Sequence, residues 1–312
     1  MNGPFAEVLS RAVLMRSEGG PVRACLVVGA RGSTPQPAGA MMLVDHSGAT
    51  FGTIGGGCVE AELTRRAMAM LLSDTSGVHD FSLDHDYGWD DGLICGGTLS
   101  VAIGTLPEAD ELTSIEQAVR GRVETRLPVF VQTEDGPARY ELHIPPQPRL
   151  LIAGGGHIGQ AVARHSLRLD FETTLFDDRA DLLERFAPEG CQRASGEIAE
   201  ALAAADIDAE TYCVIVTRGH RHDAQALAAV IDRGARYVGM IGSKRKVLLV
   251  RRELLERGVC EGSLDAVHAP IGVDIGSVTG EEIALSIAAE LVQVREQRGR
   301  VKVDGPHSEG EA

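Results

Sequence analysis

Aromatic side chains and positive charge are both scarce in this sequence. Phe, Trp and Tyr make up 4% of the 312 residues, and 45 Asp and Glu outnumber 30 Lys and Arg, which gives a formal net charge of −15. A chain of this charge repels DNA and RNA on average, and it has few rings on which bases stack. We therefore expect no nucleic-acid partner.

Long apolar runs and closely spaced cysteine pairs are also missing. The longest uncharged stretch, residues 92–107, contains four glycines and ends in proline, so it is too short and too interrupted to form a membrane-spanning helix. The first residues lack the cationic and apolar regions of a secretory signal, and the 6 cysteines include no C-x-x-C pair. We expect a soluble, cytoplasmic protein with reduced thiols and no membrane partner.

Two globular domains are expected from the length, because domains average about 150 residues. A proline-rich segment, residues 144–148, marks the boundary, since proline continues neither a helix nor a central strand. Before it, mixed helix and strand patterns predict an α+β domain over residues 1–144. After it, strands and helices alternate over residues 149–298, which predicts a Rossmann-like, doubly wound parallel sheet and places the chain in the α/β class. Residues 299–312 are polar, and we predict a flexible tail there.

Glycine is the abundant residue, with 37 positions against a usual frequency of about 7%. Many of these glycines fall in three short loops, each beside a predicted strand or helix. Glycine in a loop exposes backbone amides and lets a ligand approach them closely. The three loops are therefore the candidate binding segments.

The strongest motif is G-x-G-x-x-G at Gly154, Gly156 and Gly159, between a predicted strand and a predicted helix. In this context Gly154 permits the tight turn, Gly156 lets a pyrophosphate approach the backbone, and Gly159 lets the helix pack on the strand. Asp177, 23 residues after Gly154, is the acid expected to meet a ribose. Three interpretations remain open: a bound dinucleotide-like ligand, another phosphorylated ligand, and glycines that serve packing alone.

A second loop places Gly55, Gly56 and Gly57 directly before Cys58 at the predicted start of a helix. The positive end of the helix dipole favours a bound phosphate and a thiolate at this point. The alternative is a flexible turn with a buried cysteine that behaves as a small hydrophobic residue.

The third loop places Cys95 directly before Gly96 and Gly97, just ahead of a predicted strand. Glycines beside a cysteine leave room and access that a core position lacks. A ligand-contacting thiol and a packing cysteine are both consistent with this pattern.

A histidine pair and a basic cluster fall in the second predicted domain. We interpret His220 and His222 as loop residues before a helix whose N-cap is Asp223, with a metal or acid-base role as the alternative. Residues 244–246, Lys-Arg-Lys, oppose the dipole of a later helix, which indicates either an anion nearby or a solvated basic face.

The chain resembles the xanthine dehydrogenase accessory factor family, also called the XdhC/CoxI family, over nearly its whole length. The resemblance rests on nine segments in the same order, and this makes it far more specific than a lone glycine motif. They are residues 31–35, 39–44, 52–60, 95–97, 154–159, 177–179, 217–220, 239–246 and 268–276.

The resemblance implies a maturation factor for molybdenum hydroxylases. Such a protein binds the molybdenum cofactor and protects it while a cysteine desulfurase partner installs the terminal sulfido ligand. It then delivers the cofactor to an apo-molybdenum hydroxylase of the xanthine dehydrogenase type. Such a protein need not turn over a substrate, so a cofactor-binding chaperone is expected more than a turnover enzyme. Whether the cofactor is molybdopterin alone or a dinucleotide form stays open, as does self-association into a homo-oligomer.

The resemblance also suggests roles for individual residues. Cys95 is the first candidate, and Cys58 the second, for a catalytic thiol that approaches molybdenum or carries sulfur. Arg31 either pairs with a phosphate or is a solvent-facing turn residue. No zinc-like Cys/His spacing is present, so no separate metal site is predicted. The remaining candidate cofactor-binding residues are Gly55, Gly56, Gly57, Gly96, Gly97, Gly154, Gly156, Gly159 and Asp177.

Two other functions are compatible with the residues. One is an NAD(P)-dependent oxidoreductase, motivated by the glycine motif and Asp177, although we find no convincing proton-transfer residue beside a hydride site. The other is a nucleotide-sensing regulatory protein, which would bind a nucleotide without chemistry or molybdenum.

Overall fold

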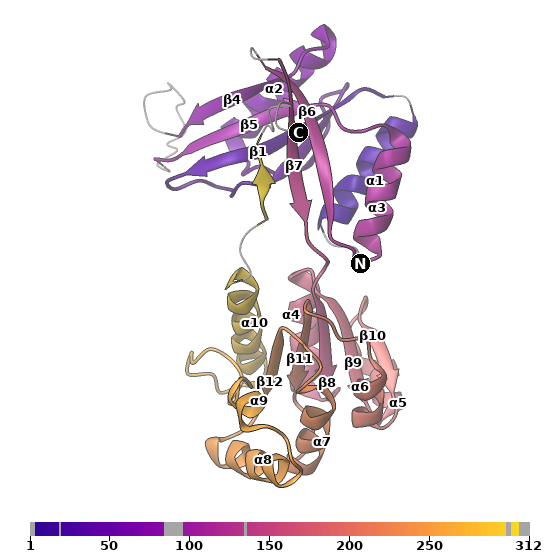
Figure 1. The fold of residues 1–312 in the computed structure, drawn as a ribbon, viewed down its shortest axis with the longest axis vertical. Coiled ribbons are helices and arrows are strands. Elements are labelled where there is room, and N and C mark those ends of the chain that lie inside the picture. Colours follow the sequence, from indigo (N-terminus) through magenta and orange to yellow (C-terminus); the bar gives the residue numbers. More distant parts are fainter. Residues whose placement is uncertain (1–3, 19, 84–95, 134–135, 298–300, 306–312) are drawn as a thin grey trace. The chain divides into compact units, whose positions relative to one another are not determined.

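The structure is a computed structural model, and it describes residues 4–18, 20–83, 96–133, 136–297 and 301–305. The chain divides into two compact units (Figure 1). The first comprises Asn2–Pro146 and Arg300–Ala312, and the second Gln147–Gly299. The division after Pro146 lies in the proline-rich segment. Among the described helices, none is long and apolar enough to cross a membrane.

Antiparallel sheets and helices build the first unit. Its strands are β1 (Val22–Arg31), β2 (Met41–Asp45), β3 (Thr50–Gly52), β4 (Gly77–Ser82), β5 (Thr98–Gly104), β6 (Thr125–Thr133), β7 (Gly136–Ile144) and β13 (Val303–Asp304). Its helices are α1 (Pro4–Ser17), α2 (Gly57–Ser73) and α3 (Ala109–Arg120). The larger sheet has the strand order β3-β2-β1-β5-β4, and the smaller has the order β13-β7-β6. This unit confirms the predicted α+β character.

Strand β1 is apolar along most of its length because both faces of the larger sheet are covered. Ala24 and Leu26 pack in a core with residues of α1, α3 and the smaller sheet, whereas Cys25 and Val27 pack in a second core with residues of α2. Alternate residues of a strand point to opposite faces, so this continuous apolar run fills both cores. Burial raises the pKa of the Cys25 thiol to about 12, which suits a cysteine that serves packing.

The structure differs from the predicted flexible tail over residues 301–305. Val303 and Asp304 pair in antiparallel register with Leu142 and Glu141 of β7. Val301 and Val303 pack against the core of the first unit. The sequence Val-Lys-Val-Asp alternates apolar and polar residues, as an edge strand does, and burial of the valines offsets the cost of ordering the segment.

A parallel sheet with helices on both faces builds the second unit. Its strands are β8 (Arg149–Ala153), β9 (Glu172–Asp177), β10 (Gln192–Ser195), β11 (Thr211–Ile215) and β12 (Tyr237–Met240). Its helices are α4 (His157–Arg168), α5 (Ala180–Phe186), α6 (Ile198–Ala204), α7 (His220–Val230), α8 (Lys244–Glu256), α9 (Glu261–Asp265) and α10 (Gly280–Gln297). Residues of α4, α5 and α10 share one core with the sheet, and residues of α6, α7, α8 and α9 share the other. The predicted Rossmann-like fold is confirmed.

The strand order of this sheet indicates where a ligand would bind. The order is β10-β9-β8-β11-β12, and every neighbouring pair is parallel. The chain builds outward from β8 through β9 to β10 and then crosses over to β11, so the direction of winding reverses between β8 and β11. A crevice at the carboxyl ends of two such strands is where ligands bind in folds of this kind.

Candidate functional site

The glycine loop of the second unit joins β8 to α4. Gly154 has φ 114°, and a Cβ there would lie 2.5 Å from the Val216 carbonyl oxygen. A Cβ at Gly159 would overlap the carbonyl oxygen of Gly154. At Gly156 a Cβ would meet no described atom within 4 Å. Gly154 and Gly159 therefore serve close packing, and Gly156 borders open space.

Asp177 at the end of β9 fastens this loop to the sheet. Its carboxylate is 2% exposed and accepts hydrogen bonds from the Gly155 amide at 2.7 Å and from the Arg179 amide at 3.0 Å. The Arg179 guanidinium donates two more, at 2.8 and 2.9 Å. Burial alone would raise the pKa of Asp177, but the guanidinium and the two amides lower it to about 2. The partners that the structure gives this carboxylate are thus groups of the chain itself.

A pocket opens at the carboxyl ends of β8 and β11. It is lined by the glycine loop, by the acidic end of β9 and by the loop that precedes α7. Among the described residues, no hydrogen bond occupies the amides of Gly156 and His157 at the start of α4. Arg218 lies across from the glycine loop and pairs with Asp178 at 2.8 Å. Residues that line the pocket include Gly154, Gly156, Asp177, Arg179, Thr217 and Arg218.

The loop before α7 differs from its predicted form. Helix α7 begins at His220 with Gly219 as its N-cap, so the prediction of Asp223 as the N-cap was wrong. Asp223 points inward instead and is fully buried, where it accepts a hydrogen bond from the Thr217 hydroxyl at 2.6 Å and pairs with Lys246. His220 and His222 are exposed.

In the first unit, the structure brings three of the predicted motif segments together. A Cβ at Gly32 would lie 3.2 Å from the Gly97 Cα, and Ser33 forms a β-bridge with Gly96. A Cβ at Gly55 would lie 2.5 Å from the Pro35 ring. Residues 31–35 therefore contact both the loop that leads into α2 and the loop that leads into β5. The first-choice thiol, Cys95, lies outside the described residues.

A carboxylate of the protein itself, that of Glu60, accepts hydrogen bonds from the loop before α2. The sequence analysis did not predict this contact. One oxygen of Glu60 accepts hydrogen bonds from the Thr53 hydroxyl at 2.7 Å and from the amides of Ile54 and Gly56, both at 2.9 Å. Burial alone would raise the pKa of Glu60, but the hydroxyl and the loop amides hold it below its usual value. The signal for this contact was an acid near the start of the predicted helix, where carboxylates satisfy free amides.

The next backbone amides along the chain have no hydrogen-bond acceptor among the described residues. Gly55 donates to the Thr53 hydroxyl at 3.2 Å, but no described residue accepts from the amides of Gly57 or Cys58. Gly56 and Gly57 have φ of 77° and 64°, and a Cβ at either would meet no described atom within 4 Å. Cys58 is half-buried at this helix start. The loop thus presents open amides and a thiol side by side.

Arg31 ends β1 opposite Thr98 and is exposed. Its side chain makes no ion pair or hydrogen bond with any residue that the structure describes. A Cβ at the nearby Gly96 would also meet open space within the described part of the chain. An exposed guanidinium that has no partner among the described residues is suited to an anion.

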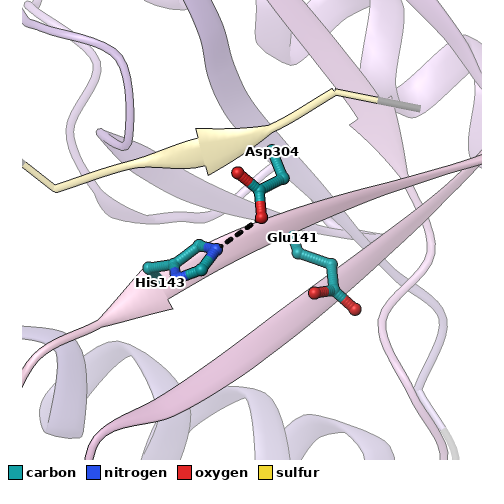
Figure 2. Close-up of side chains that lie close together, drawn as sticks. All are labelled: Glu141, His143 and Asp304. Carbon is teal, nitrogen blue, oxygen red and sulfur yellow. Dashed lines mark hydrogen bonds and ion pairs between the residues drawn. The ribbon is translucent and has the colours of Figure 1, made fainter. Parts of the chain in front are cut away.

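Glu141, His143 and Asp304, on β7 and β13, are residues of types that often bind metals, and they lie close together. Each of them already pairs with another side chain. Figure 2 shows His143 directed toward Asp304, and the two are hydrogen-bonded at 2.7 Å. The neighbouring Glu141 pairs with Arg126 at 2.9 Å and with Arg139 at 2.5 Å. Two guanidinium groups repel a cation, so this cluster joins β13 to β7 and lacks the character of a metal site.

Taken together, the fold and site define a protein with a glycine- and cysteine-bearing α+β unit and a Rossmann-like unit whose pocket lies at the switch point of its sheet. The family model described as the XdhC Rossmann domain matches residues 150–291, and that of the XdhC and CoxI family matches residues 15–82. The chain belongs to the XdhC/CoxI family, as the resemblance predicted.

Three similar proteins come from two bacteria. The uncharacterized protein YqeB of Escherichia coli is 29% identical over 290 residues, which is 92% of this chain but 46% of that protein, so the chain spans about half of its length. The molybdenum cofactor insertion chaperone PaoD of Escherichia coli is 27% identical over 85% of this chain and 80% of that protein. A protein of Bacillus subtilis described as a probable xanthine dehydrogenase subunit is 23% identical over 87% of this chain and 92% of that protein.

One solved structure shares the fold over nearly the whole chain. It is a crystal structure described as a xanthine dehydrogenase from Bacillus halodurans, with a TM-score of 0.80 and 22% identity, and the match covers 96% of this chain and 97% of that one. At this identity the likeness shows that the two chains share an architecture.

Proposed function

We propose that this chain is an accessory factor that binds the molybdenum cofactor, holds it during sulfuration and delivers it to a xanthine dehydrogenase-type molybdoenzyme. The observation that carries the proposal is the contact of residues 31–35 with both glycine loops, one of which leads to the half-buried Cys58. Within the described part of the chain, the amides of Gly57 and Cys58 and the Arg31 guanidinium have no hydrogen-bond partner. Membership of a family that includes a molybdenum cofactor insertion chaperone supports the same function.

The first unit binds the molybdenum cofactor in this proposal. Cys95 is the first-choice thiol and Cys58 the second, since a thiolate is a soft ligand suited to molybdenum and to sulfur. The amides of Gly57 and Cys58 and the Arg31 guanidinium bind the phosphate. Gly55, Gly56 and Gly97 shape the loops, and Gly96 leaves room for the ligand.

The pocket of the second unit is a candidate site for a nucleotide. Open amides at the start of α4 and the Arg179 guanidinium suit a pyrophosphate beside Gly156. Asp177 contributes by keeping the loop in place, because its carboxylate already accepts four hydrogen bonds, about as many as a carboxylate can. A nucleotide-sensing role is the second candidate function, and the pocket itself favours it.

Two protein partners follow from this function. An apo-molybdoenzyme receives the cofactor, in keeping with the similarity to PaoD. A cysteine desulfurase supplies the sulfur that becomes the terminal sulfido ligand. Because the chain holds its cargo with backbone amides and a few local cations, a net charge of −15 does not prevent anion binding.

The test is cofactor retention in cysteine variants. The full chain is purified from a cofactor-producing cell, and molybdenum is measured by mass spectrometry and pterin by the fluorescence of its oxidised form. Cys95→Ser and Cys58→Ser are compared with Cys260→Ser, an exposed cysteine of the second unit. We expect Cys95→Ser to lose most of the bound molybdenum and Cys58→Ser to lose part of it. Equal retention of molybdenum in all three variants would contradict the assignment of a cofactor-binding thiol. Absence of pterin from the unsubstituted chain would contradict the proposed function.

A further inference from the structure

A second pocket of the Rossmann-like unit is apolar, and it shares no lining residue with the pocket at the glycine loop. It opens to the surface between α7, α8 and α9, and its volume is about 200 Å³. Aliphatic side chains form most of its lining, together with Arg251 of α8 and Asp265 of α9, which pair at 2.6 Å. The aliphatic residues include Leu227, Met240, Val247, Val250 and Leu264.

The size of this pocket decides what can enter it. Binding sites for small molecules have volumes of roughly 300–1,000 Å³. An apolar cavity of roughly 150 Å³ is enough to hold a benzene molecule. A pocket of about 200 Å³ therefore admits one aromatic ring or one branched aliphatic group, and it is too small for a nucleotide or a pterin cofactor. Pockets of this kind hold the apolar anchor residues of protein interfaces.

Two exposed leucines of α8 flank the Arg251 that lines the pocket. Leu248 is 66% exposed and Leu255 is 40% exposed. They lie three residues before and four residues after Arg251, and residues at these spacings are neighbours on a helix surface. Val250 and Leu254, on another face of α8, are buried in the core of the unit. The fold is therefore served by the buried face, and the exposed leucines extend the apolar surface beside the pocket.

Positive charge is concentrated on the same helix. Helix α8 has five basic and two acidic residues, in a chain whose net charge is −15. Lys244 and Arg245 are exposed in its first turn and form no ion pair with any residue that the structure describes. Cations in a first turn oppose the helix dipole, so helix stability does not explain them. Arg252 is exposed too, and its ion pair with Glu256 is long, at 3.9 Å. These cations are available to the carboxylates of a partner.

We infer that α8 and this pocket form a docking surface for the apo-molybdoenzyme that receives the cofactor. The α8 docking surface consists of the pocket with Lys244, Arg245, Leu248, Arg252 and Leu255. The complementary surface of the partner has one large apolar side chain that enters the pocket, surrounded by carboxylates that pair with the cations. The inference rests on the proposed function, which requires an apo-enzyme as a partner.

The dimensions of the surface favour a partner that binds and leaves. Helix α8 has 13 residues and is therefore about 20 Å long and roughly 10 Å wide. This is far less than the roughly 800 Å² that each partner buries in a stable interface, such as that of a dimer. A carrier has to release its client after delivery, and a small interface suits that step. A membrane-surface helix, by contrast, places its main apolar face in the lipid, whereas that face of α8 lies in the core.

The experiment measures binding of the full chain to immobilised apo-xanthine dehydrogenase by interferometry. Leu248→Glu places a carboxylate beside the pocket, at an exposed position where the fold tolerates it. Val247→Phe fills the pocket from a half-buried position of its lining. Leu285→Glu is the matched control, because Leu285 is a 52% exposed leucine of α10 in the same unit. Denaturant unfolding of each variant verifies that it is folded, and Leu248→Glu suffices if Val247→Phe is not.

Leu248→Glu and Val247→Phe should each raise the dissociation constant for the apo-enzyme by at least about tenfold, as loss of an anchor contact does. Leu285→Glu should change it by less than about twofold. Arg245→Glu should weaken binding at low ionic strength and have a smaller effect at high ionic strength, because salt screens exposed charges.

The outcomes separate this inference from the proposed function. Equal affinities of Leu248→Glu, Val247→Phe and Leu285→Glu for the apo-enzyme would overturn the inference, and pterin retained by the unsubstituted chain would leave the function intact. Binding that depends on Leu248, in a chain that retains no pterin, would support the docking surface and overturn cofactor carriage. No affinity for the apo-enzyme, with Leu248-dependent binding to phosphatidylserine vesicles or Leu248-dependent dimers in sedimentation, would overturn the inference, because a membrane or a second copy would then be the occupant.

Discussion

The carboxylate of Asp177 accepts a hydrogen bond from the amide of Gly155 at 2.7 Å, and this contact ties the end of β9 to the glycine loop. The loop therefore has its shape before a ligand arrives. A preformed binding loop loses less conformational entropy when it binds, so the contact contributes to affinity without touching the ligand.

Stability of the second unit should depend on pH through Asp177. Its pKa is about 2 in the folded chain and about 3.9 in an unfolded chain, so the unfolded state binds more protons between these values. The carboxylate therefore contributes stability that is present above about pH 4 and is lost as the pH falls toward 2; the shift corresponds to about 2 kcal/mol. Urea unfolding measured from pH 6 to pH 2 should show this loss, and Asp177→Asn should lack it. An identical pH profile for the two proteins would contradict the assignment.

Substitution by alanine should have different effects on stability at two glycines of the same loop. Gly159→Ala places a Cβ against the Gly154 carbonyl oxygen and should destabilise the second unit by at least about 3 kcal/mol. Gly156→Ala meets no described atom and has an ordinary backbone, with φ of −68°, so its unfolding free energy should change by less than about 0.5 kcal/mol. Gly156→Ala should nevertheless weaken ligand binding, because the methyl group occupies the approach to the amides. Denaturant unfolding and a binding titration of the same variants measure both effects, and a stable Gly159→Ala would refute the packing role.

Glu60 should matter for the stability of the first unit. Glu60→Ala leaves the Thr53 hydroxyl and the amides of Ile54 and Gly56 without their shared acceptor. Since bonds to a charged acceptor are stronger than neutral ones, the expected loss is about 2 kcal/mol. Glu256→Ala is the control, because that side chain is exposed and has a weak ion pair at 3.9 Å. Thermal unfolding followed by calorimetry decides the question, and equal transition temperatures in the two variants would contradict the role of Glu60.

The strand near the carboxyl-terminal end of the chain should stabilise the first unit and not the second. Val303→Ser removes apolar surface from the core that contains Leu142, and about 1 kcal/mol of stability should be lost. Lys302→Ser changes an exposed neighbour and should have almost no effect. Amide hydrogen exchange resolves the units separately: faster exchange in β7 is expected for Val303→Ser alone. Unchanged exchange in β7 would show that β13 adds nothing to the sheet.

Local sequence patterns were enough to predict the second unit's sheet. Residues 150–153 form an apolar run followed by glycine, and a strand that is buried on both faces requires such a run. The positions that sequence reasoning missed depend on partners far along the chain. Asp223 was predicted as a helix cap, but Lys246 and Thr217 hold it inside the protein. A pairing of this kind has no local signature in the sequence. An acid near the start of a helix can cap the helix or form a buried ion pair, and the neighbouring residues do not distinguish the two roles.

The same reason explains the carboxyl-terminal strand. Val301 and Val303 are too few to form a strand alone, and their partner β7 lies about half the chain away in sequence. The contact of Glu60 with its own loop was local and was missed because the glycines were assigned to a ligand. Cys95 was identified by its position before two glycines, and it lies outside the described residues.

Delivery of the cofactor to an apo-enzyme is the step that defines an accessory factor, and it can be measured in a purified system. Purified chain loaded with molybdenum cofactor is mixed with an apo-xanthine dehydrogenase, and the hydroxylase activity that appears is measured over time. We expect activity that rises in proportion to the loaded chain and exceeds that obtained with the same amount of free cofactor, while molybdenum leaves the chain. No gain over free cofactor, with molybdenum still bound to the chain, would contradict the proposed function.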